Sequence, residues 1–408
     1  MRIAFDGTTL LPERTGVGYY TEHLLLHLAR EAAEDRFLVV SNRRPETSTP
    51  LPSNVRVAYD RRALFRLAWM QLLAPRMLKA GRVDLAHFTN GMMPLAADVP
   101  TVVTIHDMSL TLYPQYHPIR RVVLNRPLVH LAARRASAVI TVSNSAKRDI
   151  VNLYRLDPSR VHVVHEAAAP WFRPVSDPAT LESVRRRYAL PERFILYVGT
   201  IEPRKNLACL FTAFARRHAA GDLSHGLVCV GPYGWLSRGL ERRIAALGIA
   251  GAVRFTGYVP SADLPAIYSL SEMFVFPSLY EGFGLPVMEA MACGTPAIVG
   301  RNGALVEIAG GAAEVIDPLD SEMLGDVMVS LARDRELRRE LGRLGLERAR
   351  RFSWERAARE TLRVYRTALR TARRVAPVAQ DGAVRFNEIG MDPAPEPTGS
   401  AQEQWPWT

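Results

Sequence analysis

The feature that most constrains the fold of this chain is an alternation of short apolar runs with helical stretches, which occurs in both halves. Short runs rich in Val, Ile, Leu and Phe are typical of buried strands, and the stretches between them repeat apolar residues at helical spacing. Buried strands that alternate with helices predict a parallel sheet with helices on both faces. We therefore expect an α/β protein.

The predicted elements fall into two groups separated by a break. In the first group, strands are expected at residues 2–5, 37–40, 55–58, 85–88, 102–105, 139–142 and 161–164, and helices at 19–33, 64–79, 119–136 and 145–154. In the second group, strands are expected at 194–198, 227–230, 253–256, 273–276, 297–299 and 313–316. The segment between the groups, residues 166–193, contains Pro170, Pro174 and Pro178. Unpatterned, proline-bearing segments commonly separate domains.

Length supports the same division, because 408 residues exceed what one hydrophobic core usually holds together. We expect a doubly wound N-terminal domain over 1–168 and a second one over 169–352. A C-terminal helix, capped by Ser353, is predicted over 353–375. Residues 376–408 are rich in Pro, Gly, Glu and Gln, and we expect them to be disordered.

The composition of the chain limits the cellular compartment and the classes of ligand that can be expected. The net charge of +11 suits phosphorylated substrates, polyanions or an anionic membrane surface, without choosing among them. Three scattered cysteines in apolar runs predict buried free thiols in a reducing compartment. The chain starts with a strand-like run instead of a signal peptide, and no stretch reaches the ~18 apolar residues of a membrane span. These features predict a cytoplasmic protein.

The stretch 279–294 carries two carboxylates, Glu281 and Glu289, with seven residues between them. Gly284 leads into Leu285 and Pro286 directly after a predicted strand, and proline is favoured in the first turn of a helix. First-turn amides and the helix dipole attract anions. The stretch therefore predicts a site for a phosphate-bearing ligand beside the two glutamates.

Three other predicted strand ends carry suggestive residues. They are Gly16 to Gly18, His106 with Asp107, and the turn 199–206, which contains Arg204 and Lys205. Ligands of open parallel sheets bind outside the carboxyl ends of the strands. With two such segments in each half, a cleft between two domains is expected. His106 is interpreted as a sugar contact or a base.

The cations of the 199–206 turn bear on the chemistry. A diphosphate leaving group gains charge as its bond breaks, and fixed cations stabilise that state. The sequence has no Asp-x-Asp with which to hold a divalent ion against a nucleotide diphosphate, so we expect Arg204 and Lys205 to neutralise the phosphates and no metal to be needed. The Gly16-Val17-Gly18 loop lacks the third glycine of the dinucleotide fingerprint, so a nicotinamide cofactor is not expected.

Two other functions stay open at this point. A carboxylate pair such as Glu281 and Glu289 is also what a glycoside hydrolase uses. A basic chain could bind nucleic acid, although clustered Lys and Arg with interleaved aromatics are missing. Glu289 interrupts an apolar helical run, so its carboxylate needs a partner.

The motifs resemble those of the retaining glycosyltransferases of the GT-B fold, in particular the nucleotide-sugar-dependent family 4. The family marker is Glu-x7-Glu within a stretch like EGFGLPVMEA, and the resemblance extends through TGVGYYTEHL, TIHDMSL, YVGTIEPRKNL and VRFTGYVP to about residue 374. It implies two Rossmann-like domains that face a central cleft, an N-terminal acceptor domain, a C-terminal nucleotide-sugar domain and a C-terminal helix that returns to the first domain.

The resemblance also implies roles for the residues of the C-terminal half. Glu281 would lie by the hydroxyls of the donor sugar and Glu289 by those of the ribose. The amides of Phe283, Gly284 and Leu285 would approach the diphosphate. Arg204 and Lys205 would hold the phosphates; many family members carry an arginine where this chain has Thr200, so Arg204 would cover that role.

The N-terminal half would complete the site. His106 would contact the transferred sugar, and Gly16 and Gly18 would approach the diphosphate when the cleft closes. The implied reaction retains the anomeric configuration and uses no metal or cofactor. The GTIEPRKN form looks most like bacterial mannosyl- and rhamnosyl-transferases, which predicts GDP-mannose as donor and a glycan or lipid-linked acceptor in surface polysaccharide biosynthesis. The basic, apolar stretch 61–73 fits peripheral contact with anionic lipid at the inner face of the cell membrane, or a core-packed helix.

Overall fold

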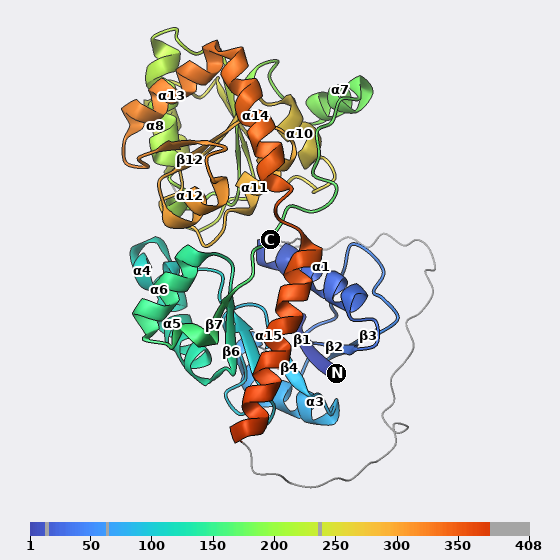
Figure 1. Cartoon of the computed structure of the whole chain (residues 1–408). Helices are drawn as coiled ribbons and strands as arrows, with labels where there is room; N and C mark the ends of the chain where they lie inside the picture. Colours follow the sequence, from blue (N-terminus) through green and yellow to red (C-terminus); the bar gives the residue numbers. More distant parts are fainter. Residues whose placement is uncertain (13–15, 63–64, 236–238, 376–408) are drawn as a thin grey trace.

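The computed structural model describes residues 1–12, 16–62, 65–235 and 239–375. Its strands form two parallel sheets, one above the other in Figure 1. The first has the order β3-β2-β1-β4-β5-β6-β7 and the second β10-β9-β8-β11-β12-β13. The predicted α/β fold with two doubly wound halves is thus confirmed. The predicted tail, 376–408, lies outside the described residues.

The strands lie close to their predicted positions. In the first sheet they are β1 (Arg2–Asp6), β2 (Arg36–Ser41), β3 (Val55–Tyr59), β4 (Leu85–Phe88), β5 (Thr101–Thr104), β6 (Ala138–Thr141) and β7 (Val161–Val163). In the second they are β8 (Phe194–Val198), β9 (Gly226–Val230), β10 (Val253–Gly257), β11 (Met273–Phe276), β12 (Ala297–Gly300) and β13 (Glu314–Ile316). The predicted domain limit at residue 168 falls between β7 and β8 and stays a prediction.

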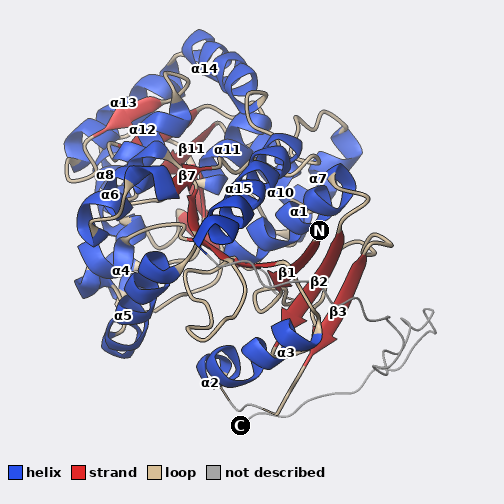
Figure 2. Cartoon of the chain, turned by 60° about the horizontal axis from the view of Figure 1, so that its bottom comes forward, coloured by secondary structure: helices blue, strands red, loops and turns tan. Residues whose placement is uncertain are grey.

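Helices connect most of the strands and cover both faces of the sheets. Those of the first half are α1 (Gly16–Glu31), α2 (Arg66–Ala68), α3 (Ala74–Ala80), α4 (Ser109–Leu112), α5 (Ile119–Arg135) and α6 (Asn144–Tyr154). Those of the second are α7 (Pro178–Arg187), α8 (Leu207–Ala219), α9 (Leu240–Ala246), α10 (Leu264–Leu270), α11 (Leu285–Ala292), α12 (Gly303–Ala309), α13 (Ser321–Arg333) and α14 (Arg335–Ala349). The last helix is α15 (Trp354–Val375). In Figure 2, β1, β2 and β3 lie between α1 and α15 on one side and α2 and α3 on the other.

Side chains alternate between the two faces of each strand, and this alternation determines which residues form the core on each face of the sheet. Ile3 and Phe5 pack with α1 and α15, whereas Ala4 between them packs with Trp69 and Phe88 on the opposite face. Every residue of β4, β5, β6, β8 and β11 is buried, as expected of parallel strands with helices on both faces.

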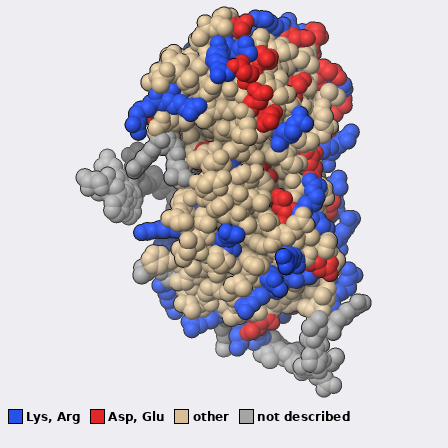
Figure 3. Space-filling view, turned by 90° about the vertical axis from the view of Figure 1, so that its left-hand side faces the viewer, with Lys and Arg blue, Asp and Glu red and all other residues tan. Residues whose placement is uncertain are grey.

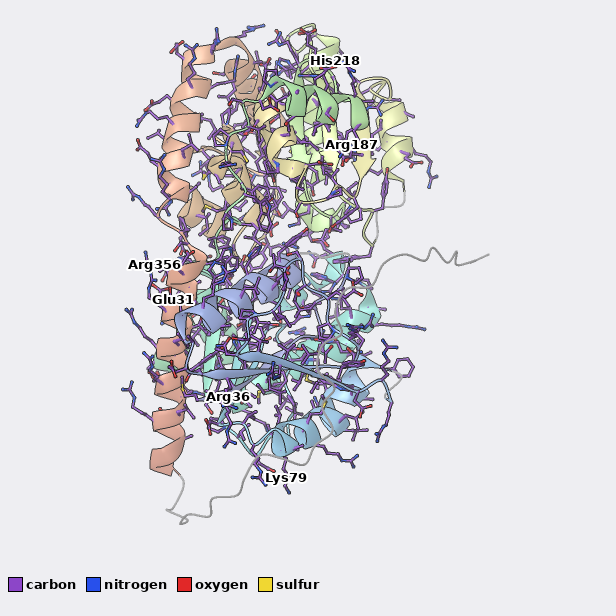
Figure 4. All side chains as sticks on the ribbon, turned by 90° about the vertical axis from the view of Figure 1, so that its right-hand side faces the viewer. Glu31, Arg36, Lys79, Arg187, His218 and Arg356 are labelled. Atoms are coloured by element: carbon purple, nitrogen blue, oxygen red, sulfur yellow. The ribbon has the colours of Figure 1, made fainter. Side chains whose placement is uncertain are left out.

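The C-terminal helix returns to the first sheet, as the resemblance implied. α15 runs down from the second sheet to the first in Figure 1. Its Tyr365 hydroxyl is 2.6 Å from His87 Nδ1 in β4, and Arg359 pairs with Glu31 at 3.0 Å. Figure 4 shows Glu31, the last residue of α1, beside the start of α15. Ser353 accepts a hydrogen bond from the amide of Arg356, so the predicted cap is confirmed.

Two predicted helices need correction. α1 begins at Gly16, so Gly16 and Gly18 belong to its first turn and not to a preceding loop. The expected helix over 64–79 is divided into α2, a π-helical turn at Trp69–Leu73 and α3. Trp69 and Met70 are buried in this turn, so part of the apolar stripe of 61–73 belongs to the core. No helix among the described residues is long and apolar enough to cross a membrane.

Candidate active site

The site forms where both sheets reverse their strand order. The order reverses between β1 and β4 in the first sheet and between β8 and β11 in the second. At such a switch point the loops at the carboxyl ends of neighbouring strands diverge and leave a crevice for a ligand. The predicted segments after β8 and β11 are therefore brought together by adjacent parallel strands.

Glu281 is at the centre of a charged cluster. Its carboxylate lies 2.6 Å from Lys205 Nζ, 3.0 Å from Arg204 Nη1 and 2.5 Å from the hydroxyl of Ser278, which donates to it. Burial favours the neutral acid, but Arg204 and Lys205 outweigh it and hold the pKa of Glu281 below its usual range. Glu281 is therefore a carboxylate whose two oxygens are both occupied.

Arg204 is held more firmly than Lys205. Besides Glu281 it pairs with Glu202 at 2.7 Å and donates to the carbonyl oxygen of Tyr280. The 3-10 turn Pro203–Lys205, which follows β8, ends at Asn206 in the left-handed conformation and directs both cations toward the loop after β11. Lys205 pairs with Glu281 and lies over the ring of Phe276, 4.9 Å from its centroid, so its ammonium is also held at the cluster.

α11 starts beside this cluster. Gly284 precedes it with φ of 104°, a conformation that residues with a Cβ rarely adopt, so glycine is favoured at this position. Pro286 stands in the first turn, as predicted. Pro286 has no N–H, and the amides of Val287 and Met288 donate to the carbonyl oxygen of Gly284. The amide of Leu285, the first residue of α11, is therefore the one suited to an anion.

The first turn of α1 faces the same place from the other half of the chain. A Cβ on Gly16 would lie 3.9 Å from Leu285 Cδ1, in the first turn of α11. Two helix N-termini thus meet across the cleft, and their dipoles add to the positive potential of Arg204 and Lys205. The structure brings together the predicted Gly16, Gly284, Leu285, Arg204 and Lys205.

His106 lies after β5 with both ring nitrogens engaged. Nδ1 is 3.0 Å from Glu166 Oε1, and Nε2 is 2.9 Å from the carbonyl oxygen of Thr89. Burial favours the neutral ring, but the hydrogen bond and charge of Glu166 prevail and raise the pKa of His106. With acceptors at both nitrogens, the surroundings favour the imidazolium form of the ring, in which both nitrogens donate hydrogen bonds.

Glu289 interrupts the apolar helix α11, and its carboxylate has the hydrogen-bond partner that the sequence predicted it would need. The hydroxyl of Tyr268 donates to its Oε2 at 3.0 Å. Burial raises the pKa of Glu289 to about 7, because this one neutral donor compensates little of the lost hydration. A small cavity of about 20 Å³ lies next to it and is lined by Tyr19, Ser261 and Leu264 among others.

The two halves are in contact around the site. A Cβ on Gly282 would lie 1.8 Å from the carbonyl oxygen of His106, so the loop after β11 touches the loop after β5 backbone to backbone. The hydroxyl of Tyr280 donates to Asp149 Oδ2 at 2.7 Å and accepts from the amide of Met108 at 3.2 Å. The cleft is closed at these points.

Residues that sequence reasoning did not assign complete the site. Glu202, Ser278 and Tyr280 hold the charged cluster, and Glu166 holds His106. Glu202, Ser278 and Tyr280 lie next to predicted residues in the sequence, and this proximity was the only indication of their role. Glu166 lies sixty positions after His106, and no sequence pattern connects the two.

The fold and the site together define a glycosyltransferase of the GT-B class. Residues 182–348 match the family described as "Glycosyl transferases group 1", and residues 14–168 match "Glycosyltransferase Family 4". The chain belongs to this family of glycosyltransferases.

Similar proteins agree with this assignment. Over 383 residues the chain is 30% identical to the O-antigen chain mannosyltransferase B of Escherichia coli, and the alignment covers 90% of this chain and 100% of the relative. The fold is similar to sucrose-phosphate synthase from Thermosynechococcus elongatus, with a TM-score of 0.72, 21% identity and coverage of 91% and 99% of the two chains. It is also similar to Anabaena HepE in complex with UDP and glucose, with a TM-score of 0.68, 19% identity and coverage of 92% and 99%.

The occupied oxygens of Glu281 argue against the glycoside-hydrolase alternative. Such an enzyme needs one carboxylate free to attack the sugar or to activate water. Both oxygens of Glu281 are instead bound by Lys205, Arg204 and Ser278. The cluster is suited to stabilising charge, and its carboxylate is not free to act as a nucleophile.

Proposed function

We propose that the protein transfers mannose from GDP-mannose to a glycan or lipid-linked acceptor of surface polysaccharide, with retention of configuration and without a metal ion. The name of the E. coli relative, an O-antigen chain mannosyltransferase, supports the sugar and the pathway class. The pairing of Lys205 and Arg204 with Glu281 beside the start of α11 supports the metal-free chemistry and is the observation on which the proposal mainly rests.

The proposed reaction is a front-face displacement. The bond between the anomeric carbon and the β-phosphate oxygen breaks, and the acceptor hydroxyl oxygen forms the new bond on the same face. The leaving phosphate takes the proton of that hydroxyl. Lys205, Arg204 and the amides of Gly284 and Leu285 stabilise the charge that gathers on the diphosphate. Glu281 keeps both cations in place before the donor arrives and then accepts from the sugar hydroxyls.

The remaining residues position the donor. Glu289 would accept hydrogen bonds from the ribose hydroxyls, and these charge-assisted bonds would favour its ionised form. His106, as an imidazolium, would stabilise negative charge. It would donate a hydrogen bond to the sugar once one of its ring nitrogens is released from Glu166 or from Thr89. A nucleotide-sugar donor also makes the cytoplasm the proposed location.

A donor panel tests the proposal. The protein is incubated with GDP-mannose, GDP-fucose, UDP-glucose, UDP-GlcNAc and dTDP-rhamnose, and its protection from thermal unfolding is measured together with nucleotide release. We expect GDP-mannose to give the largest shift and the fastest release. Proton NMR of the product linkage then tests retention. Equal responses to all donors would refute the donor, and an inverted product would refute the mechanism.

A further inference from the structure

A pocket of about 260 Å³ lies where the chain passes between its two halves. The chain passes from one half to the other after β7 and again between α14 and α15 (Figure 1). His165 belongs to the first passage and Phe352 to the second, and their rings are 5.5 Å apart. Both residues line the pocket, whereas Arg204, Lys205 and Glu281 of the candidate active site do not. The pocket is therefore separate from the donor site and adjoins both connections between the halves.

Side chains from both halves line the pocket. Asn144, at the start of α6, and His165 come from the first half, and Glu307 in α12 comes from the second. Arg356, in the first turn of α15, also lines it and lies at the level where the halves meet in Figure 4. A ligand in this pocket would therefore contact both halves at once.

The two carboxylates of the pocket are already bound by other groups. Glu307 accepts hydrogen bonds from two amides at the start of α6 and lies 3.1 Å from His165 Nε2. Glu360 accepts a hydrogen bond from Arg356 Nε at 2.8 Å. These acidic side chains therefore pair with groups other than the two remaining arginines of the pocket.

The remaining arginines are Arg348 and Arg351. Arg348 donates to the carbonyl oxygens of Ile308 and Glu307 at 2.8 and 2.6 Å, and it lies over the ring of Phe352, 4.9 Å from the centroid. Arg351 is exposed, and its side chain forms no ion pair with any residue that the structure describes. Burial and then the charge of Arg351 lower the pKa of Arg348, although Glu307 opposes them. Two like charges thus lie close together at the pocket.

Other arginines of α14 are neutralised by carboxylates. Arg339 pairs with Glu336 at 2.5 Å, and Arg343 pairs with Glu340 at 2.7 Å. Figure 3, in which α14 and α15 lie toward the right-hand edge, shows basic and acidic side chains next to one another there. At the end of α14 this pairing stops, and the unneutralised guanidinium groups are suited to an anion.

We propose that the pocket binds a small phosphate ester, such as a hexose phosphate, and that the ligand holds the two halves together. Arginine matches phosphate because its planar fork forms parallel, charge-assisted hydrogen bonds. A volume of about 260 Å³ leaves room beyond a phosphate group, since one water takes ~30 Å³. Asn144 and Ser353 add polar groups for the hydroxyls of a sugar. Ser353 Oγ accepts from the amide of Arg356 and keeps its own proton to donate.

Binding at this pocket does not depend on which donor the enzyme uses, whereas its effect on turnover rests on the proposed transfer reaction. Release of the nucleotide requires the halves to separate, and opening steps of this kind limit many turnover rates. A ligand that contacts Asn144 in one half and Arg348 and Arg351 in the other opposes this separation. It should therefore slow steady-state release of the nucleotide.

The test measures protection from thermal unfolding by mannose 6-phosphate at low salt and without donor, with inorganic phosphate and mannose as comparison probes. We expect mannose 6-phosphate to protect the wild-type chain more than phosphate does, and mannose to have no effect. Arg351→Gln should weaken binding by about 10- to 100-fold, the usual effect of losing a hydrogen bond to a charged group. Arg350→Gln changes the neighbouring exposed arginine, which does not line the pocket, and is the matched control. Lys205→Met, which removes a cation of the donor site, should leave the binding unchanged.

The proposal is supported if Arg351→Gln alone among these variants loses the protection. It is overturned if neither phosphate-bearing probe protects the wild-type chain, or if Arg350→Gln weakens binding to the same extent. It is also overturned if Lys205→Met abolishes the binding while Arg351→Gln keeps it, since the probe would then occupy the donor site.

Nucleotide release from GDP-mannose at saturating mannose 6-phosphate tests the effect on turnover. The rate should fall by about twofold or more in the wild-type chain and in Arg350→Gln, and the probe should have no effect in Arg351→Gln. An unchanged wild-type rate at saturation would overturn the coupling to domain separation. Failure of the proposed function would show instead as no nucleotide release without the probe, and the protection assay decides on the pocket in that case as well.

Discussion

Lys205 Nζ lies 2.6 Å from Glu281 Oε1, although 76 positions separate the two residues in the sequence. The contact exists because β8 and β11 are parallel neighbours at the switch point, so the turn after one meets the loop after the other. A cation paired in this way is fixed in place before a donor binds. It needs little rearrangement to stabilise a departing diphosphate.

Removing the lysine charge tests this role. Lys205→Met should lower kcat by about 10²–10³-fold, the usual effect of losing one donor to a developing anion. Because Glu281 keeps Arg204 and Ser278, the fold should survive. Steady-state release of nucleotide measures the effect, and Arg242→Met, a change at an exposed arginine of α9, is the control. Normal turnover in Lys205→Met would remove Lys205 from the site.

Glu289 gives the apo protein a predictable pH dependence. Its pKa is raised to about 7 in the folded chain from an ordinary value near 4.5, so the folded state binds the extra proton between these values. Stability should therefore fall as the pH rises from about 4.5 to about 7 and stay level above, with a total change of up to about 3 kcal/mol. Glu289→Gln should flatten this part of the profile.

Thermal unfolding of the wild-type protein and of the Glu289→Gln variant between pH 5 and 8 measures this pH dependence of stability. At pH 8 the Glu289→Gln variant should have the higher Tm in the absence of donor, because it buries no charge. The same variant should be protected less by nucleotide, since an amide accepts weaker hydrogen bonds from ribose hydroxyls than a carboxylate does. Parallel profiles for the two proteins would show that Glu289 does not titrate in this range.

Gly282 sits where the two halves touch. A Cβ at this position would lie 1.8 Å from the carbonyl oxygen of His106, which is part of the backbone and cannot rotate away. Gly282→Ala should therefore prevent the closed arrangement and lower kcat/KM by at least about 100-fold, as expected when reacting groups are misplaced by about 1 Å. Gly251→Ala is the control, because nothing lies within 4 Å of its Cβ position. Equal activity of the two variants would contradict the importance of this contact.

Glu307 joins the halves at a second point. From α12 it accepts hydrogen bonds from the amides of Asn144 and Ser145 at the start of α6, at 2.9 and 3.0 Å, and it lies 3.1 Å from His165 Nε2. These donors outweigh burial and lower the pKa of Glu307 to about 2. The contact should therefore persist until the pH falls below about 4.5 and be lost as it approaches 2.

Glu307→Ala should shift the donor-free protein toward a more open form. Small-angle scattering should then give a larger radius of gyration at neutral pH, and nucleotide should restore much of the wild-type value. Glu336→Ala, which removes an exposed carboxylate from α14, is the matched control. An unchanged radius of gyration would mean that Glu307 is not needed to hold the halves together.

Much of the fold could be predicted because the central parallel strands are apolar along their length and the helices between strands are amphipathic. The start of α11 could be predicted from Gly284 and Pro286, whose conformations suit it. The division of 64–79 could not, because tertiary packing of Trp69 and Met70 produces the π-helical turn and periodicity carries no sign of it.

The site was predictable to the extent that it lies at strand ends. Arg204, Lys205 and Glu281 carry their charges in loops that the topology brings together. The ionisation states were not predictable, because they depend on partners distant in sequence. Glu166 raises the pKa of His106, and burial raises the pKa of Glu289 because Tyr268 is its one hydrogen-bond donor among the described residues.

The most direct test of the account is nucleotide release from the preferred donor after exhaustive treatment with EDTA, measured for the wild-type chain and for Lys205→Met. The account predicts that EDTA leaves the wild-type rate unchanged, because Lys205, Arg204 and the start of α11 supply the positive charge, and that Lys205→Met is slow with or without added Mg²⁺. A wild-type rate that falls with EDTA and returns with Mg²⁺ or Mn²⁺ would contradict it.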